Sequence, residues 1–225
     1  MRAPISIVIP TFNAESGLPG CLGALGEGLS AGLIREVIFS DGGSADATLR
    51  IAEAAGAEVV TGPPSRGGQL ARGARAAGGE WLLFLHADTV LEEGWSGAVL
   101  DVLGQPGAWY FRLRFDGTGF APRFVAGWAN LRSKLFHLPY GDQGLLIHRS
   151  VFDAAGGYPD MPLMEDVALA RALGKALQAL PIEAVTSAEK YRRQGWLKRG
   201  GRNLATLLRY FAGADVEQLA ARYRR

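Results

Sequence analysis

The chain has 225 residues, is 48% hydrophobic and carries a formal net charge of +2, with Cys21 as its single cysteine. This composition can build one large α/β domain, and one cysteine excludes a framework of internal disulfides, so we expect a cytoplasmic protein. No apolar run reaches the roughly 20 residues that a membrane span needs, and the N-terminus lacks the pattern of a signal peptide, so we expect neither a span nor a leader.

The first half of the chain alternates predicted strands with predicted helices. The strands are expected at residues 5–11, 36–40, 57–61 and 81–85, and the helices at 14–29, 44–55 and 69–77. Ser44 is expected to cap the second helix, which Gly56 ends. Three successive strand-helix-strand crossovers predict a Rossmann-like, mostly parallel sheet with helices on both faces.

Right-handed crossovers place every strand-to-helix loop at one rim of such a sheet, and ligands bind beyond the carboxyl ends of the strands. We therefore expect the functional residues of the first half to lie together at this rim. They are Thr11, Asn13, Glu15, Asp41, Gly42, Arg66, Gln69, His86 and Asp88.

His86 and Asp88 follow a buried strand and, with a period of two, should face the same way while Ala87 turns back. A desolvated carboxylate needs a partner, and a divalent cation is a common one for Asp88. His86 has three open roles: a second metal ligand, a hydrogen-bond donor to a sugar or ribose, or a structural histidine.

Two further rim segments each allow two interpretations. Residues 41–44 place the carboxylate of Asp41 beside glycines and free amides, which suits a nucleotide, but they also fit an ordinary strand-to-helix turn. Arg66 follows two prolines in an expected flexible loop, where it could bind phosphate or simply be a surface arginine.

The second half is less regular and is expected to extend the sheet as a mixed half. Helices are predicted at residues 94–103 and 122–136, and strands at 109–115 and 145–147. Glu165 and Asp166 stand before a helical pattern, where acids favour the helix dipole. One of them could instead be a general base, because an attacking hydroxyl must lose a proton.

The C-terminal segment carries a large positive charge. Residues 190–225 hold ten Lys or Arg against Asp215 and Glu217, a balance of +8, which leaves −6 for the preceding residues. Leu204, Leu207 and Phe211 recur at helical spacing there, so an amphipathic helix is expected at 203–212. It can pack on its own domain or dock at an interface, with anionic phospholipid or nucleic acid as the candidate partner.

Four segments in this order, residues 10–15, 41–44, 83–89 and 164–166, resemble the family 2 glycosyltransferases over nearly the whole chain. Residues 140–144 and 83–89 further resemble a bacterial subgroup of small, single-domain members. The resemblance implies a GT-A fold, with a transferase domain at residues 1–190 and a basic helical tail at 191–225. It also implies a nucleotide-diphosphate sugar donor, with a UDP-sugar favoured, Mg²⁺ or Mn²⁺, and inversion at the anomeric carbon.

The resemblance also implies roles for single residues. Asp88 matches the last acid of the family's Asp-x-Asp motif and would coordinate the metal, and Asp166 matches the second acid of its Glu-Asp pair and would be the general base. Asp142 and Glu165 are implied acceptor contacts. His86 departs from the family, which usually has Asp at that position. The remaining implied donor contacts are Thr11, Asn13, Glu15, Asp41, Gly42, Arg66, Gln69, His86 and Ala87.

The acceptor is unknown, and a lipid-linked one fits the basic tail at the inner face of a membrane; no nucleic acid is expected. Residues 194–196 match the processive members' Gln-x-x-Arg-Trp motif only superficially, which favours transfer of a single sugar. Two alternatives stay open. One is a nucleotidyltransferase, against which residues 10–15 count because they are not a glycine-rich basic loop. The other is a non-catalytic nucleotide-sugar sensor or membrane adaptor built on the same fold.

Overall fold

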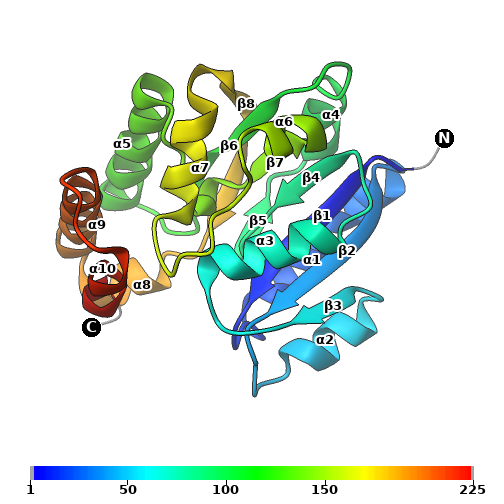
Figure 1. Ribbon diagram of the computed structural model, residues 1–225, viewed down its shortest axis with the longest axis horizontal. Helices are drawn as coiled ribbons and strands as arrows, with labels where there is room; N and C mark the ends of the chain where they lie inside the picture. The colour runs from blue at the N-terminus through cyan, green and yellow to red at the C-terminus, as the bar shows by residue number, and fades with distance from the viewer. Residues whose placement is uncertain (1–2, 224–225) are drawn as a thin grey trace.

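The computed structural model describes residues 3–223 (Figure 1). Within them, eight strands form one sheet of order β3-β2-β1-β4-β7-β6-β8-β5. The strands are β1 Ile5–Thr11, β2 Ile34–Asp41, β3 Glu58–Thr61, β4 Trp81–Phe84, β5 Thr89–Leu91, β6 Ala108–Phe115, β7 Leu145–His148 and β8 Leu177–Thr186. The helices are α1 Leu18–Ser30, α2 Thr48–Ala54, α3 Arg66–Ala76, α4 Trp95–Leu100, α5 Phe120–Phe136, α6 Arg149–Ala154, α7 Glu165–Leu173, α8 Glu189–Gln194, α9 Trp196–Phe211 and α10 Val216–Tyr223, with short 3-10 turns at Gly141–Gln143 and Gly174–Ala176.

The first half is the predicted parallel layer. β1 pairs in parallel with β2 and with β4, and β2 pairs in parallel with β3. Parallel neighbours require crossover connections, and α1, α2 and α3 supply them in turn. The carboxyl ends of β1, β2 and β4 therefore lie at one rim, as the alternation predicts.

The second half is mixed, which confirms the predicted extension. β7 runs antiparallel to both β4 and β6, whereas β6 and β8 are parallel and β5 closes the edge antiparallel to β8. β7 thus joins the two halves in one continuous sheet, and residues far apart in sequence can meet at the rim beside β4.

Helices cover both faces of the sheet, because side chains of successive strand residues point to opposite faces. Val8 packs with Leu70 of α3 and Val167 of α7 in one core cluster. Its neighbours Ile7 and Ile9 pack in the other cluster, against α1 and α4. The GT-A-like architecture expected from the sequence is therefore observed.

Four local predictions are wrong. Ser44 does not cap a helix, because α2 begins only at Thr48 and the Ser44 hydroxyl donates to Asp41. Residues 66–69 are not a flexible loop but the first turn of α3, capped by Ser65. The helix predicted from residue 14 begins at Leu18, and the one predicted to residue 103 ends at Leu100.

The C-terminal helices fold back against the second half of the sheet (Figure 1). α9 contacts α5, α8 and α10, and Leu207 and Leu219 are buried in the first core cluster. The helix predicted at 203–212 is thus the second part of a longer α9. None of the helices within residues 3–223 is long and apolar enough to cross a bilayer. The division at residue 190 stays a prediction.

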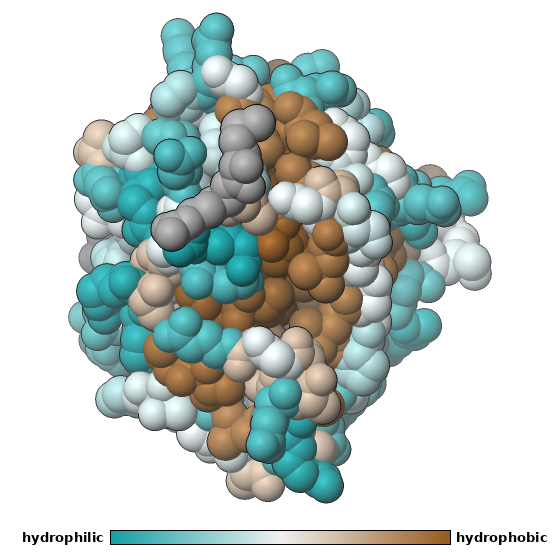
Figure 2. Space-filling view, turned by 90° about the vertical axis from the view of Figure 1, so that its right-hand side faces the viewer, coloured by the Kyte–Doolittle hydropathy of each residue, from teal (hydrophilic) through white to brown (hydrophobic). Residues whose placement is uncertain are grey.

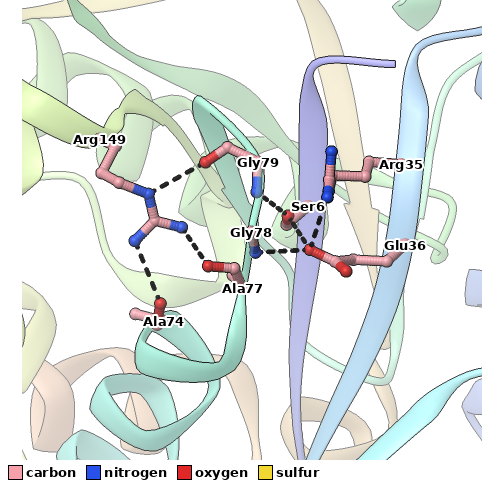
Figure 3. Close-up of polar contacts among 8 residues, drawn as sticks. All are labelled: Ser6, Arg35, Glu36, Ala74, Ala77, Gly78, Gly79 and Arg149. Atoms are coloured by element: carbon pink, nitrogen blue, oxygen red, sulfur yellow. Dashed lines mark hydrogen bonds and ion pairs between the residues drawn. The ribbon is translucent and has the colours of Figure 1, made fainter. Parts of the chain in front are cut away.

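The edge where the parallel strands β1, β2 and β4 begin lies on the side of the molecule away from α8 and α9. Figure 2 shows this side, with apolar residues gathered at its centre inside a polar margin. Figure 3 shows two groups of polar contacts near the start of β1 and the end of α3, one around Arg149 and one around Ser6 and Glu36. The Arg149 guanidinium donates to the carbonyls of Ala74, Ala77 and Gly79, where α3 ends, and Ser6 links Glu36 to the Gly79 amide. The last carbonyls of a helix have no intrahelical partner, so Arg149 stabilises the α3–β4 turn.

Replacing Arg149 should therefore destabilise the fold. We expect Arg149→Ala to lower the free energy of unfolding by about 2 kcal/mol, because three carbonyls lose a charged donor. Arg35→Ala is the matched control, since its exposed ion pair with Glu36, 3.8 Å long, should contribute less than about 0.5 kcal/mol. Urea denaturation of both variants measures the difference, and equal losses would contradict this assignment.

Candidate active site

Two cavities meet at the rim of the sheet. The first, of about 720 Å³, lies beyond β1 and β4 and is lined by Thr11, Asn13, Gln69 and Ala87 among others. The second, of about 480 Å³, lies under α8 and α9. The two are adjacent because they share six lining residues, which are Arg66, His86, Asp88, Thr186, Ser187 and Lys190. A ligand in the first cavity can therefore reach one in the second at this shared edge.

Asp41 lies beneath the first cavity rather than in its lining. Its carboxylate is buried and accepts four hydrogen bonds, from the hydroxyls of Thr11 and Ser44 and from the amides of Gly43 and Ser44, at 2.6 to 2.9 Å. Burial would raise the pKa of Asp41, but these hydrogen bonds outweigh it and hold the pKa below its ordinary value. Asp41 thus organises the loop after β2.

Asn13 and Glu15 fasten the loop after β1 to the same segment. The Asn13 side chain accepts from the Ala45 amide at 2.8 Å, and Glu15 accepts from the Ala47 amide at 2.8 Å. Asn13 has a positive φ of 49°, a conformation that asparagine tolerates better than most residues. Asn13 lines the first cavity, whereas Glu15 is exposed outside it.

The Gln69 side chain fixes the spacing between the carboxyl ends of β1 and β2. Its side-chain amide donates to the carbonyls of Thr11 and Ser40, at 2.7 and 2.9 Å. Gly42 lies against it, because a Cβ there would come within 3.2 Å of both Gln69 Oε1 and Pro64. The structure therefore brings the predicted residues of the first half together, but several of them form hydrogen bonds within the protein instead of lining the open cavity.

Arg66 links the first half of the fold to the second. Its Nε lies 3.1 Å from Glu165 Oε1, and its Nη2 lies 3.5 Å from His86 Nε2. Glu165 is 1% exposed, and its second oxygen has no hydrogen-bond partner within the described residues. Burial raises the pKa of Glu165, whereas the Arg66 guanidinium opposes that rise. Glu165 lines the first cavity and not the second, which places it beside Arg66 rather than at the expected acceptor side.

His86 faces the same junction in its neutral form. Burial and the neighbouring Arg66 lower its pKa to about 4, so the imidazole is uncharged at neutral pH. A guanidinium can only donate, so a hydrogen bond between the two requires Nε2 of His86 to accept, with the ring proton on Nδ1. A Cβ on Gly141 would come within 2.6 Å of this Nε2, which is why only glycine fits there.

Asp166 and Asp142 line the second cavity from its floor. Asp166 is the second residue of α7, and its Oδ2 accepts from the Gly141 amide at 2.8 Å, so the carboxylate is held in place. Burial raises the pKa of Asp142 to about 6 despite the opposing charge of Arg132, and its Oδ1 is buried without a partner among the described side chains. Of the three acids predicted in the second half, Asp142, Glu165 and Asp166, only Glu165 lies outside the second cavity.

The Asp88 side chain lies at the edge that both cavities share. Residues 3–223 contain no group of three or more His, Cys, Asp or Glu that could form an all-protein metal cage. Mg²⁺ is commonly held by one or two carboxylates together with substrate phosphates and water, so a single Asp88 fits a metal that arrives with a diphosphate. The turn is closely packed, since a Cβ on Gly17 would lie 2.9 Å from the Asp88 Cα.

Sequence reasoning missed the roof of the second cavity. Lys190, Tyr191, Arg199, Asn203 and Tyr223 line it, and hydrogen bonds join Tyr191 to Asn203, Asn203 to Tyr223, and Tyr223 to Arg199. The only signal was the density of basic and aromatic residues after residue 189, which does not indicate that α8 to α10 fold back over the rim.

Comparison with known proteins shows the family of this chain. The model of the family described as "Glycosyl transferase family 2" matches residues 6–152. A PGL/p-HBAD biosynthesis glycosyltransferase of Mycobacterium tuberculosis is 38% identical over 101 residues, and the match covers 41% of this chain and 39% of that protein. The match thus spans well under half the length of the relative.

Three solved structures share the fold at low sequence identity. Mannosyltransferase PcManGT from Pyrobaculum calidifontis, in complex with GDP-Man and Mn²⁺, has a TM-score of 0.65 and 17% identity, covering 93% of this chain and 65% of that one. S. aureus TarS 1–349, with UDP-GlcNAc, gives 0.60 and 14%, covering 82% and 58%. Glucosyl-3-phosphoglycerate synthase from Mycobacterium tuberculosis, with Mn²⁺, UDP and glucosyl-3-phosphoglycerate, gives 0.55 and 21%, covering 82% and 70%. The family match over most of the chain, on a fold that these enzymes share, shows that the protein belongs to glycosyl transferase family 2 and has the GT-A fold.

Proposed function

We propose that the protein transfers one sugar from a nucleotide-diphosphate sugar to an acceptor hydroxyl, with inversion at the anomeric carbon and with Mg²⁺ or Mn²⁺ as cofactor. The observation that carries this proposal is the pair of cavities that meet at Arg66, His86 and Asp88. A group-transfer enzyme must hold two substrates with their reacting atoms in contact, and this arrangement allows it.

The first cavity is proposed to hold the donor. Thr11, Asn13, Gln69 and Ala87 line it, while Asp41, Gly42 and Glu15 shape the loops around it. A UDP-sugar is favoured, and the base would lie toward the loops after β1 and β2. Contact with Asp41 itself requires the loop at Gly43 to give way, since all of its present partners are protein groups.

The diphosphate is proposed to lie at the shared edge. Asp88 would hold the metal, which neutralises the charge that develops on the departing nucleoside diphosphate. Arg66 offers a guanidinium to the same oxygens, and Glu165 holds it in place through the 3.1 Å ion pair. Neutral His86 can accept a hydrogen bond or coordinate the metal at this edge without adding positive charge.

Asp166 is proposed to be the general base. Its carboxylate lines the second cavity, where Oδ2 accepts from the Gly141 amide and Oδ1 from the Val167 amide, both at 2.8 Å. In a single displacement the acceptor oxygen bonds to the anomeric carbon and its proton passes to Asp166. The bond from that carbon to the phosphate oxygen breaks in the same step, and the electron pair leaves with the nucleoside diphosphate. Attack opposite to the leaving group inverts the anomeric centre.

The second cavity is proposed to hold the acceptor, with Asp142 in contact with it. Residues 1–190 would form the transferase domain, and the tail at 191–225, with a charge of +7, would favour a peripheral position on an anionic membrane and a lipid-linked acceptor. The tail also contributes the roof of this cavity through α8, α9 and Tyr223.

Removing the proposed metal ligand or base should abolish turnover. We expect Asp88→Ala and Asp166→Asn each to lower kcat by about 100-fold or more, because one loses charge neutralisation and the other loses proton transfer. Release of UDP or GDP from a panel of nucleotide sugars with Mn²⁺ measures the effect.

Asp153→Asn is the matched control, since Asp153 is an exposed acid outside both cavities. It should retain full activity. Wild-type turnover in either site variant would refute the mechanism, and a product with retained anomeric configuration would refute inversion.

The charged form of Asp142 should destabilise the folded protein at neutral pH. Its pKa is raised from 3.8 to about 6 in the folded state, so the group favours folding most below pH 3.8, and that contribution is lost as the pH rises through 6. We expect Asp142→Asn to stabilise the protein on the order of 2 kcal/mol at pH 8 and by little at pH 4, while weakening acceptor binding. Denaturation at the two pH values checks this, and an equal effect at both would contradict it.

A further inference from the structure

An exposed apolar stripe runs along α5. Five large side chains recur at helical spacing on its outer side, opposite the buried Ala126 and Ala129. They are Phe120 (82% exposed), Phe124 (57%), Trp128 (50%), Leu131 (46%) and Leu135 (59%). Nothing in the described part of the chain covers them, although large aromatic side chains are rarely left exposed in a row.

A second stripe lies on α9, beside the first. Leu197, Leu204, Leu208 and Phe211 are exposed along one flank of this helix. The two helices contact each other, and Trp128 and Leu204 line the same crevice between them. The stripes are therefore continuous, and together they form one surface, here called the α5–α9 surface, at the left edge of Figure 1.

The charged residues of these two helices are all basic. α5 contains Arg123, Arg132 and Lys134, and α9 contains Lys198, Arg199, Arg202 and Arg209, whereas neither helix contains an aspartate or a glutamate. Arg123, Lys134, Lys198 and Arg209 are exposed. Apolar and aromatic side chains with basic residues on the flanks match an anionic bilayer interface, where rings enter the headgroup layer and cations meet phosphate.

We propose that the α5–α9 surface docks on an anionic lipid bilayer. Only the purpose of this docking rests on the proposed function. The docking also extends that function, because the transferase domain would contact the membrane through α5, in addition to the tail. A second copy of the chain fits less well, because pairing two such surfaces would bring like charges together.

The geometry also connects this surface to the acceptor cavity. α9 gives Arg199 and Asn203 to the cavity, while its other flank gives Leu204 and Leu208 to the surface. Docking would therefore place the cavity beside the headgroup layer, where the hydroxyl of a lipid-linked acceptor lies.

Co-sedimentation of the full chain with vesicles tests the docking without any substrate. We expect binding to phosphatidylcholine vesicles containing 30% phosphatidylglycerol, and a loss of about tenfold or more both in pure phosphatidylcholine and in high salt. The variant Phe120→Ser/Phe124→Ser/Leu135→Ser should lose about tenfold or more in binding to the anionic vesicles, because three inserted side chains are removed. These residues line neither cavity, so release of nucleoside diphosphate from a soluble donor should be unchanged.

Leu29→Ser/Leu100→Ser is the matched control, with exposed leucines in α1 and α4, away from the α5–α9 surface. It should bind vesicles like the wild type. Absence of binding at low salt, or equal binding by the triple variant, would overturn the proposal. A dimer in light scattering that the triple variant converts to a monomer would assign the surface to a second copy instead. Because binding and turnover are measured separately, an inactive protein that still binds vesicles would refute the transferase mechanism and leave the docking intact.

Discussion

The ion pair between Arg66 and Glu165 is the contact on which the site depends. Arg66 begins α3 in the parallel half, and Glu165 begins α7 in the mixed half, so the pair ties the two halves together at the rim. Removing Arg66 would leave a carboxylate that is 1% exposed without its counter-charge, which is costly in a protein interior. The start of α3 is packed accordingly, because a Cβ on Gly67 would overlap the Pro159 carbonyl of the segment before α7.

This link explains why the two cavities share an edge. Parallel β1, β2 and β4 bring one set of loops to the rim, and antiparallel β7 carries the chain back so that Gly141 and Asp166 lie against His86. The proposed donor contacts therefore come from the first half and the proposed base from the second. His86, which stands where the family usually has aspartate, is kept neutral by burial and by Arg66. One fewer negative charge beside Asp88 would suit a site in which Arg66 offsets the charge of the proposed diphosphate.

Much of this could be predicted from the sequence, and the failures have physical reasons. Apolar runs that end at Thr11, Ser40 and Leu85 indicated the strands, and crossover geometry then indicated a common rim. Ser44 was assigned to a cap because local sequence does not show that the Asp41 carboxylate competes for its hydroxyl. Residues 66–69 looked like a loop because glycines are poor helix formers, yet here they allow the close approach to Pro159. The roof at Tyr191 and Asn203 depends on long-range packing of α9 on α5, which helical periodicity alone does not encode.

We propose that a nucleoside diphosphate and a divalent metal meet at the edge shared by Arg66, His86 and Asp88. Anomalous scattering from crystals grown with Mn²⁺ and UDP tests it most directly. We expect a manganese peak coordinated by Asp88 and by diphosphate oxygens, with Arg66 in contact with the same diphosphate. A well-occupied UDP without manganese at Asp88, or a diphosphate bound away from Arg66, would contradict it.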